Sequence, residues 1–159
     1  WDHPDLDDHN RPLNPRGLRN APLMGALIKD RGLMPQLCLS STAVRARQTA
    51  RLAISAMDED VELLEVRELY DFGTGQAIAQ AIASHGHSAS PLLVIAHNPA
   101  SQGFALETCG SGDQTALSQL ESKYPTCALC QIEYNMTSWA DISQTKGTLK
   151  AFTTPRMLG

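Results

Sequence analysis

Runs of apolar residues recur along the chain and are separated by segments whose apolar positions follow a helical period. The clearest run is "PLLVIAHN", residues 91–98. Its apolar residues follow one another without alternation, which is typical of a parallel strand covered on both faces. Shorter strands are predicted from Leu37 to Ser40 and over residues 61–66. Two alternating runs, 127–135 and 148–155, predict antiparallel or edge strands near the end of the chain.

Helices are predicted between these strands. Their segments are 17–31, 43–57, 75–86 and one that opens at or just after Pro99. Ser41 or Thr42 is the expected N-cap of the second helix, and Pro99 suits a first helical position. Residues 1–16 and 109–126 show neither period and are expected to be irregular.

Strands that alternate with helices predict a single α/β domain over residues 1–159, with three layers and a mostly parallel sheet. Domains of this class usually open on a strand, whereas this chain opens on the loop-like segment "WDHPDLDDHN". We therefore expect the first strand of the sheet to precede Trp1.

Composition and charge limit which classes of binding partner and which cellular compartment are expected. A formal net charge of −4 gives no electrostatic reason to expect nucleic acid or an anionic membrane as a partner. No apolar run approaches the ~18 residues of a membrane helix, and the acidic start is unlike a signal peptide. Four scattered cysteines favour free thiols and a cytoplasmic location. Cys127 and Cys130 form a C-x-x-C without further ligands at suitable spacing, so no metal is expected there.

The candidate chemistry lies where two predicted strands end. Ligands of open α/β sheets bind beyond the carboxyl ends of the strands. Arg45 follows the strand that ends at Ser40, and His97 lies at the end of the apolar run in residues 91–98. The helix that starts after each strand offers free N–H groups to an anion. An arginine and an imidazole at this edge therefore predict a phosphate site.

Helix geometry separates the two arginines of this segment. Arg45 and Arg47 are roughly 200° apart around the helix axis, so they face different surroundings. Arg45 lies in the first turn, nearest the strand end. Arg47 and Arg51 are four residues apart and predict a solvated stripe. The alternatives are a surface salt bridge for Arg45 and a satisfied rim position for His97.

At these residues the sequence resembles a known family. "SSTAVRARQTA", residues 40–50, resembles the Ser-x-x-x-Arg-Ala-x-Gln-Thr segment of the histidine phosphatase (phosphoglycerate-mutase-like) superfamily. "VIAHNP", residues 94–99, resembles its second histidine segment. "DDHNRPLNPRG", "APLMG" and "FTTPR" are similar to the SixA-type phosphohistidine phosphatase branch. The segments follow the family's order over nearly the whole chain.

The resemblance implies hydrolysis through a phosphorylated enzyme histidine. In this family a histidine of an Arg-His pair attacks phosphorus, and water then releases phosphate. Arg45 and His97 match residues that surround the phosphoryl oxygens. Arg11 matches a position near the pocket entrance, with a loop-fixing salt bridge as its alternative, and Asn98 is a further phosphate contact or only orients its turn. The scheme uses no metal or cofactor, and its substrates are a phosphohistidine protein or a small phosphorylated compound.

The nucleophile is not found in residues 1–159. The resemblance places the Arg-His pair just before Trp1, so the natural protein is expected to carry it there and the present chain alone is expected to be inactive. His3 is a poor replacement because it lies in an acidic loop. The alternative function is a non-catalytic domain that binds phosphate or a phosphoprotein. A metal site of His9 and nearby aspartates would rest on loop residues, which make poor ligand cages.

Overall fold

The computed structural model describes residues 7–71 and 73–159. The expected first strand and His3 lie outside these residues. The chain forms two compact units. The first unit is Trp1–Asp71 with Ala89–His97, and the second unit is Phe72–Ser88 with Asn98–Gly159. The single domain over residues 1–159 stays a prediction.

The first unit is built on a parallel sheet of three strands. Strand β1 (Leu37–Ser41) lies in the middle and is buried along its whole length. It pairs in parallel with β2 (Glu62–Val66) on one side and with β3 (Leu92–Ile95) on the other. All three strands were predicted from their apolar runs. This parallel sheet confirms the α/β class.

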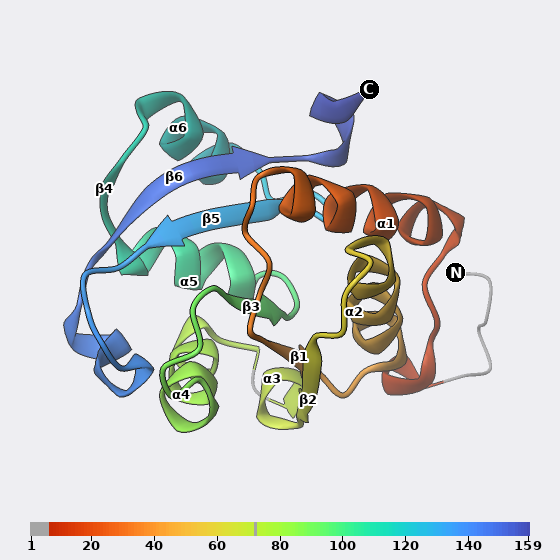
Figure 1. Ribbon diagram of the computed structural model, residues 1–159, viewed down its shortest axis with the longest axis horizontal. Helices are drawn as coiled ribbons and strands as arrows, with labels where there is room; N and C mark the ends of the chain where they lie inside the picture. Colours follow the sequence, from red (N-terminus) through yellow and green to blue (C-terminus); the bar gives the residue numbers. More distant parts are fainter. Residues whose placement is uncertain (1–6, 72) are drawn as a thin grey trace. The chain divides into compact units, whose positions relative to one another are not determined.

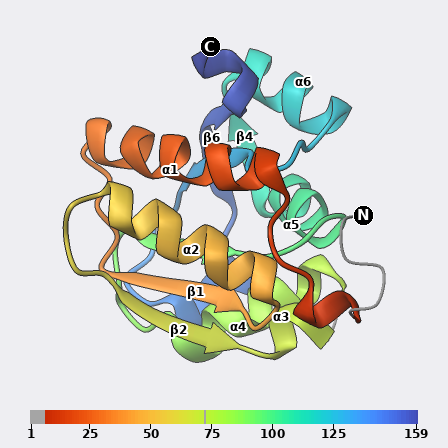
Figure 2. The same cartoon turned by 90° about the vertical axis from the view of Figure 1, so that its right-hand side faces the viewer.

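Helix α2 (Val44–Ala56) packs against this sheet, and α1 (Pro15–Asp30) packs against α2 (Figures 1 and 2). The helices approach closely because small residues meet between them. A Cβ atom added at Gly25 of α1 would lie 2.1 Å from the carbonyl oxygen of Ala53 in α2. Glycine is therefore required at position 25 by space rather than by backbone conformation.

Two short helical segments complete the first unit: η1 (Asp8–Asn10) and α3 (Glu68–Asp71). In Figure 2 the red segment that holds η1 runs beside α3. Neither was predicted, because a single turn leaves no periodic pattern. Helix α1 begins two residues before the prediction, since the Asn14 side chain accepts a hydrogen bond from the N–H of Gly17.

The N-cap prediction for α2 was wrong. The cap position is Ala43, which makes no side-chain cap hydrogen bond. The hydroxyls of Ser41 and Thr42 each lie within hydrogen-bond distance of a histidine ring, His97 for Ser41 and His9 for Thr42. The Ser41 hydroxyl also accepts from the N–H of Ala43 at 3.2 Å, just before the first residue of the helix.

The second unit begins with helices α4 (Gly75–His85) and α5 (Ala100–Thr108), which pack against each other. Its sheet has β6 (Gly147–Thr153) in the middle, antiparallel to β5 (Leu129–Glu133) and parallel to β4 (Cys109–Gly112). The two predicted C-terminal strands are thus confirmed as an antiparallel pair, visible in Figure 1. Short helical turns η2 (Trp139–Gln144) and η3 (Pro155–Leu158) flank β6.

The prediction of irregular structure over residues 109–126 was wrong. This segment holds β4 and helix α6 (Gln114–Ser122). Strand β4 reads "CGSG" and has no hydrophobic alternation, so only its pairing with β6 makes it a strand. Helix α6 is short, and its N-cap Asp113 accepts from the N–H of Ala116 at 2.9 Å. It is stabilised by burying Leu120 against Leu149 and Phe152.

In the part of the chain that the structure describes, no helix is long and apolar enough to cross a membrane.

Candidate functional site

Arg45 lies in the first turn of α2, directly beyond the carboxyl end of β1. Its Nη1 donates to the main-chain carbonyl of Asp8 at 2.8 Å, and its Nη2 donates to Asp8 Oδ2 at 3.1 Å. The Arg45 side chain is 30% exposed, so it remains partly accessible to water. The guanidinium is thus held at the strand end with a carboxylate as its present partner.

Arg47 points elsewhere, as the helix period predicts. Its Nε lies 3.2 Å from Glu65 Oε1 on strand β2. The Arg47 side chain is 32% exposed, so this residue of the predicted solvated stripe is only partly accessible to water. Arg51, one turn later, is exposed. The two arginines of "VRAR" therefore hold two different carboxylates.

His97 follows β3 by two residues and meets the end of the neighbouring strand. Its Nε2 lies 2.7 Å from the Oγ of Ser41, which is fully buried. Burial lowers the pKa of His97, and the positive charge of Arg45 lowers this pKa further. The imidazole is therefore expected to be neutral at pH 7 in the absence of a bound anion.

Asp8 and Tyr70 join Arg45 and His97 in the same place, although sequence reasoning did not select them. The Tyr70 hydroxyl donates to Asp8 Oδ2 at 2.9 Å. The hydrogen bond from Tyr70 and the contact with Arg45 lower the pKa of Asp8, so this carboxyl is ionised. The ring of Tyr70 lies edge-on to His97, with 5.8 Å between the ring centroids. We call Asp8, His9, Arg45, Tyr70 and His97 the strand-end cluster.

His9 belongs to this cluster through two contacts. Its Nε2 lies 2.9 Å from Thr42 Oγ1, and its ring lies edge-on to Tyr70 at 4.7 Å between centroids. A metal site of His9 with neighbouring aspartates had been considered from the sequence. Over residues 7–71 and 73–159 the structure shows no group of three His, Cys, Asp or Glu side chains that could hold a metal ion.

Arg11 and Asn98 are the two further residues expected at the site. Arg11 belongs to the first unit and Asn98 to the second. Arg11 is half-buried directly after η1, and its N–H donates to the carbonyl of Asp8. Asn98 belongs to the second unit, where its amide donates to the carbonyl of Tyr124 and its Oδ1 accepts from the N–H of Gln102. These bonds fit the alternative in which Asn98 orients its own turn. A phosphate contact of either side chain stays a prediction.

Comparison with known proteins identifies the family. The model for the histidine phosphatase superfamily (branch 1) matches residues 7–81. An uncharacterized protein of Mycobacterium tuberculosis strain H37Rv is 32% identical over 157 residues, which cover 97% of this chain and 96% of that protein. The chain belongs to the histidine phosphatase superfamily.

Solved structures of related proteins share its fold. A protein of Agrobacterium tumefaciens assigned as the phosphohistidine phosphatase SixA is 25% identical with a TM-score of 0.76, over 98% of this chain and 91% of that one. The protein histidine phosphatase SixA in complex with tungstate is 21% identical with a TM-score of 0.75, over 97% of this chain and 90% of that one. Together with the family model, the match to the Agrobacterium tumefaciens protein confirms the SixA-type assignment made from the sequence segments.

Within this histidine phosphatase, Gln48 of the "RARQT" segment has a structural task that sequence reasoning missed. Its Oε1 accepts from the N–H of Leu13 at 2.7 Å and so ties the segment after η1 to helix α2. Thr49 of the same segment donates to the carbonyl of Arg45 at 2.8 Å. Gln48 and Thr49 both belong to the segment that resembles the family, but their residue types alone do not show which backbone group each side chain binds.

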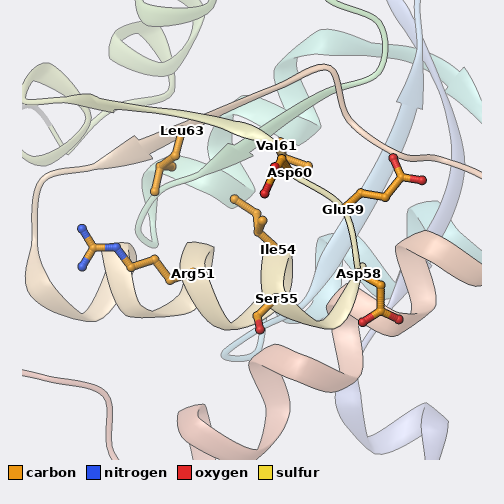
Figure 3. A pocket seen from close by; sticks show the side chains of 8 residues that line it. All are labelled: Arg51, Ile54, Ser55, Asp58, Glu59, Asp60, Val61 and Leu63. Carbon is orange, nitrogen blue, oxygen red and sulfur yellow. The ribbon is translucent and has the colours of Figure 1, made fainter.

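A separate surface pocket lies at the other end of α2, between this helix and strand β2 (Figure 3). Its lining residues are Arg51, Ile54, Ser55, Asp58, Glu59, Asp60, Val61 and Leu63. Asp58 pairs with Lys29 at 2.8 Å, which leaves two further carboxylates around the pocket. Because carboxylates outnumber the single arginine here, this pocket does not suit an anionic substrate of a phosphatase.

Proposed function

We propose that this histidine phosphatase hydrolyses phosphohistidine in a protein, or a small phosphorylated compound, through a phosphohistidine enzyme intermediate. The observation that carries the proposal is the strand-end cluster. There a guanidinium from α2 donates to one anionic oxygen of Asp8, and an imidazole from the end of β3 lies near enough for the charges of Arg45 and Asp8 to act on it. Charge that spreads over phosphoryl oxygens in the transition state is stabilised by such fixed donors.

The proposed reaction has two displacements. A histidine nitrogen attacks phosphorus as the bond to the leaving group breaks, and the leaving group takes up a proton. Water then attacks the phosphorylated histidine and releases inorganic phosphate, which returns the histidine to its starting state. The nucleophile is the histidine that the family resemblance places before Trp1, and this part of the scheme stays a prediction.

Arg45 and His97 have separate tasks in this scheme. Arg45 presents several N–H donors on one face and keeps its charge throughout, so it binds and orients the phosphoryl group. His97 is neutral before binding, and a phosphoryl dianion beside it favours its protonated form. His97 then donates a hydrogen bond to a phosphoryl oxygen, and the developing negative charge is stabilised.

The cluster favours substrates with a good leaving group. A poor leaving group needs a carboxylic acid that donates a proton, and the carboxyl in the cluster, Asp8, has a lowered pKa and is ionised. A phosphorylated imidazole leaves readily without such an acid. This argument and the SixA-type relatives support phosphohistidine as the substrate class. Free cysteines at positions 38, 109, 127 and 130 support the proposed cytoplasmic location.

The test is hydrolysis of a phosphoramidate and of an aryl phosphate by the natural protein and by two variants. Arg45→Ala and His97→Ala are each expected to lower kcat/KM by about 100-fold or more, as loss of a transition-state donor does. Arg51→Ala is the matched control on the same helix and is expected to leave the rate unchanged. Equal rates for native protein and Arg45→Ala would contradict the proposal. Phosphate binding without turnover would favour the non-catalytic binder instead.

A further inference from the structure

One carboxylate oxygen of the strand-end cluster is bound from two sides. The Tyr70 hydroxyl donates to Asp8 Oδ2 at 2.9 Å, and Arg45 Nη2 donates to the same atom at 3.1 Å. A carboxylate oxygen and a phosphoryl oxygen are both anionic acceptors that seek such donors. The position of this Oδ2 atom therefore shows where Tyr70 and Arg45 bind an anionic oxygen together.

We propose that Tyr70 is a phosphate-contacting residue of this site, and that the Asp8 carboxylate holds the place of a phosphoryl oxygen between Tyr70 and Arg45. The inference rests on the proposed function, which assigns Arg45 to phosphate. When a phosphoryl group binds, its oxygen accepts from both donors and the Asp8 carboxylate moves out into water.

The orientation of the Tyr70 ring supports this role. The ring makes edge-on contacts with two imidazoles, His9 at 4.7 Å and His97 at 5.8 Å between centroids. The Nε2 of His9 in turn lies 2.9 Å from Thr42 Oγ1. These two ring contacts restrict the orientation of the Tyr70 side chain. The hydrogen bond to Asp8 raises the pKa of Tyr70, so the hydroxyl keeps its proton and remains a donor at neutral pH.

Asp8 can leave its place without unfolding the site. Its side chain is 49% exposed and lies on the three-residue segment η1 rather than on a strand or a long helix. An ion pair with this exposure contributes little free energy, since water and salt screen it. A phosphoryl dianion carries more charge than the carboxylate and competes well for the same two donors.

A rival explanation gives Tyr70 only a structural task, namely to hold Asp8 in place. The two explanations differ in what the loss of the Tyr70 hydroxyl does once the Asp8 charge has been removed. If Tyr70 only anchors Asp8, then Tyr70→Phe in the Asp8→Asn background leaves phosphate binding unchanged, because no charged competitor remains to be anchored. If Tyr70 contacts phosphate, removing its hydroxyl in the same background weakens binding.

The experiment measures the affinity of the natural protein for tungstate and for inorganic phosphate by calorimetry. Asp8→Asn keeps the shape of the side chain but removes its charge, and we expect it to bind both anions more tightly. The double variant Asp8→Asn/Tyr70→Phe is expected to bind about tenfold more weakly than Asp8→Asn, the effect of one hydrogen bond to a charged group. Asp71→Asn and Tyr134→Phe are matched controls outside the cluster and are expected to bind as the native protein does.

The outcomes separate this inference from the proposed function. Equal affinity of Asp8→Asn and the double variant is the result that the anchoring explanation predicts, and it overturns the role of Tyr70 alone, while phosphate binding by Arg45 stands. Tighter binding by the double variant likewise overturns the inference. If the native protein and Asp8→Asn bind neither anion, the phosphate site itself is wrong, and the proposed function falls together with the inference.

Discussion

At the scale of single residues, His97 shows how burial and a neighbouring charge set a protonation state. The imidazole is half-buried against Ser41, and water that would stabilise its charged form is largely excluded. The Arg45 guanidinium adds repulsion, whereas the Asp8 carboxylate opposes it. These influences together lower the pKa of His97. The same arrangement makes the imidazole sensitive to any anion that binds beside Arg45.

We expect the pKa of His97 to rise in Arg45→Ala, because this variant removes a positive charge, and to fall in Asp8→Asn, because it removes a negative one. Arg51→Ala is the control and leaves the pKa unchanged. The measurement is an NMR titration of the His97 ring signals. A fall of the pKa in Arg45→Ala would show that the two side chains do not interact as the structure indicates.

The lowered pKa of His97 also makes the stability of the folded protein depend on pH. The folded protein binds this proton less readily than the unfolded chain, so the contribution of neutral His97 is present above about pH 6.5. It is lost as the pH falls below that value, through the range down to the folded pKa. This part of the acid sensitivity is expected to be smaller in His97→Gln.

At the scale of elements, hydrophobic pattern predicted most of the helices and strands that bury apolar side chains, but it missed the short helix α6. Strands β1, β2 and β3 have continuous or near-continuous apolar runs, and helices α1 and α2 have apolar faces. Strand β4 escaped prediction because glycine and serine supply no apolar signal, and its hydrogen bonds come from β6. The close approach of α1 and α2 also left no periodic signal, since it depends on one glycine.

Gly25→Ala is expected to destabilise the protein by about 1–3 kcal/mol, the usual cost of an added group in a packed contact. The reason is that the new Cβ would lie 2.1 Å from the Ala53 carbonyl, so the two helices would have to separate. Unfolding in urea measures the change. Gly103→Ala is the matched control in helix α5, where nothing lies within 4 Å, and there alanine is expected to stabilise slightly.

At the scale of the whole molecule, each compact unit carries apolar residues that are fully buried. Leu39 lies at the centre of the parallel sheet in the first unit, and Leu120 and Leu149 lie in the core of the second unit. The strand-end cluster belongs to the first unit only. A formal net charge of −4 would repel an anionic substrate at a distance, so attraction must come from Arg45 within the cluster.

Leu120→Ala is expected to lower the free energy of unfolding by about 2–5 kcal/mol, because it leaves a cavity between α6 and β6. Leu106→Ala is the matched control, since Leu106 is 38% exposed and loses far fewer contacts. Urea unfolding followed by circular dichroism gives both values. Similar losses for the two variants would mean that the second core does not depend on α6.

The sequence by itself determined the α/β class, the main strands and helices, and the family, because these follow from hydrophobic period and from residue types at set spacings. It also pointed to Arg45 and His97, since polar residues that end buried strands are recognisable along the chain. Only the tertiary structure decided which side chains meet them. Asp8 and Tyr70 are 62 residues apart, and the hydroxyls of Ser41 and Thr42, one of which was expected to cap α2, each lie beside a histidine ring. Such contacts join segments that are far apart in the sequence, and these segments come together only when the sheet and its helices have packed.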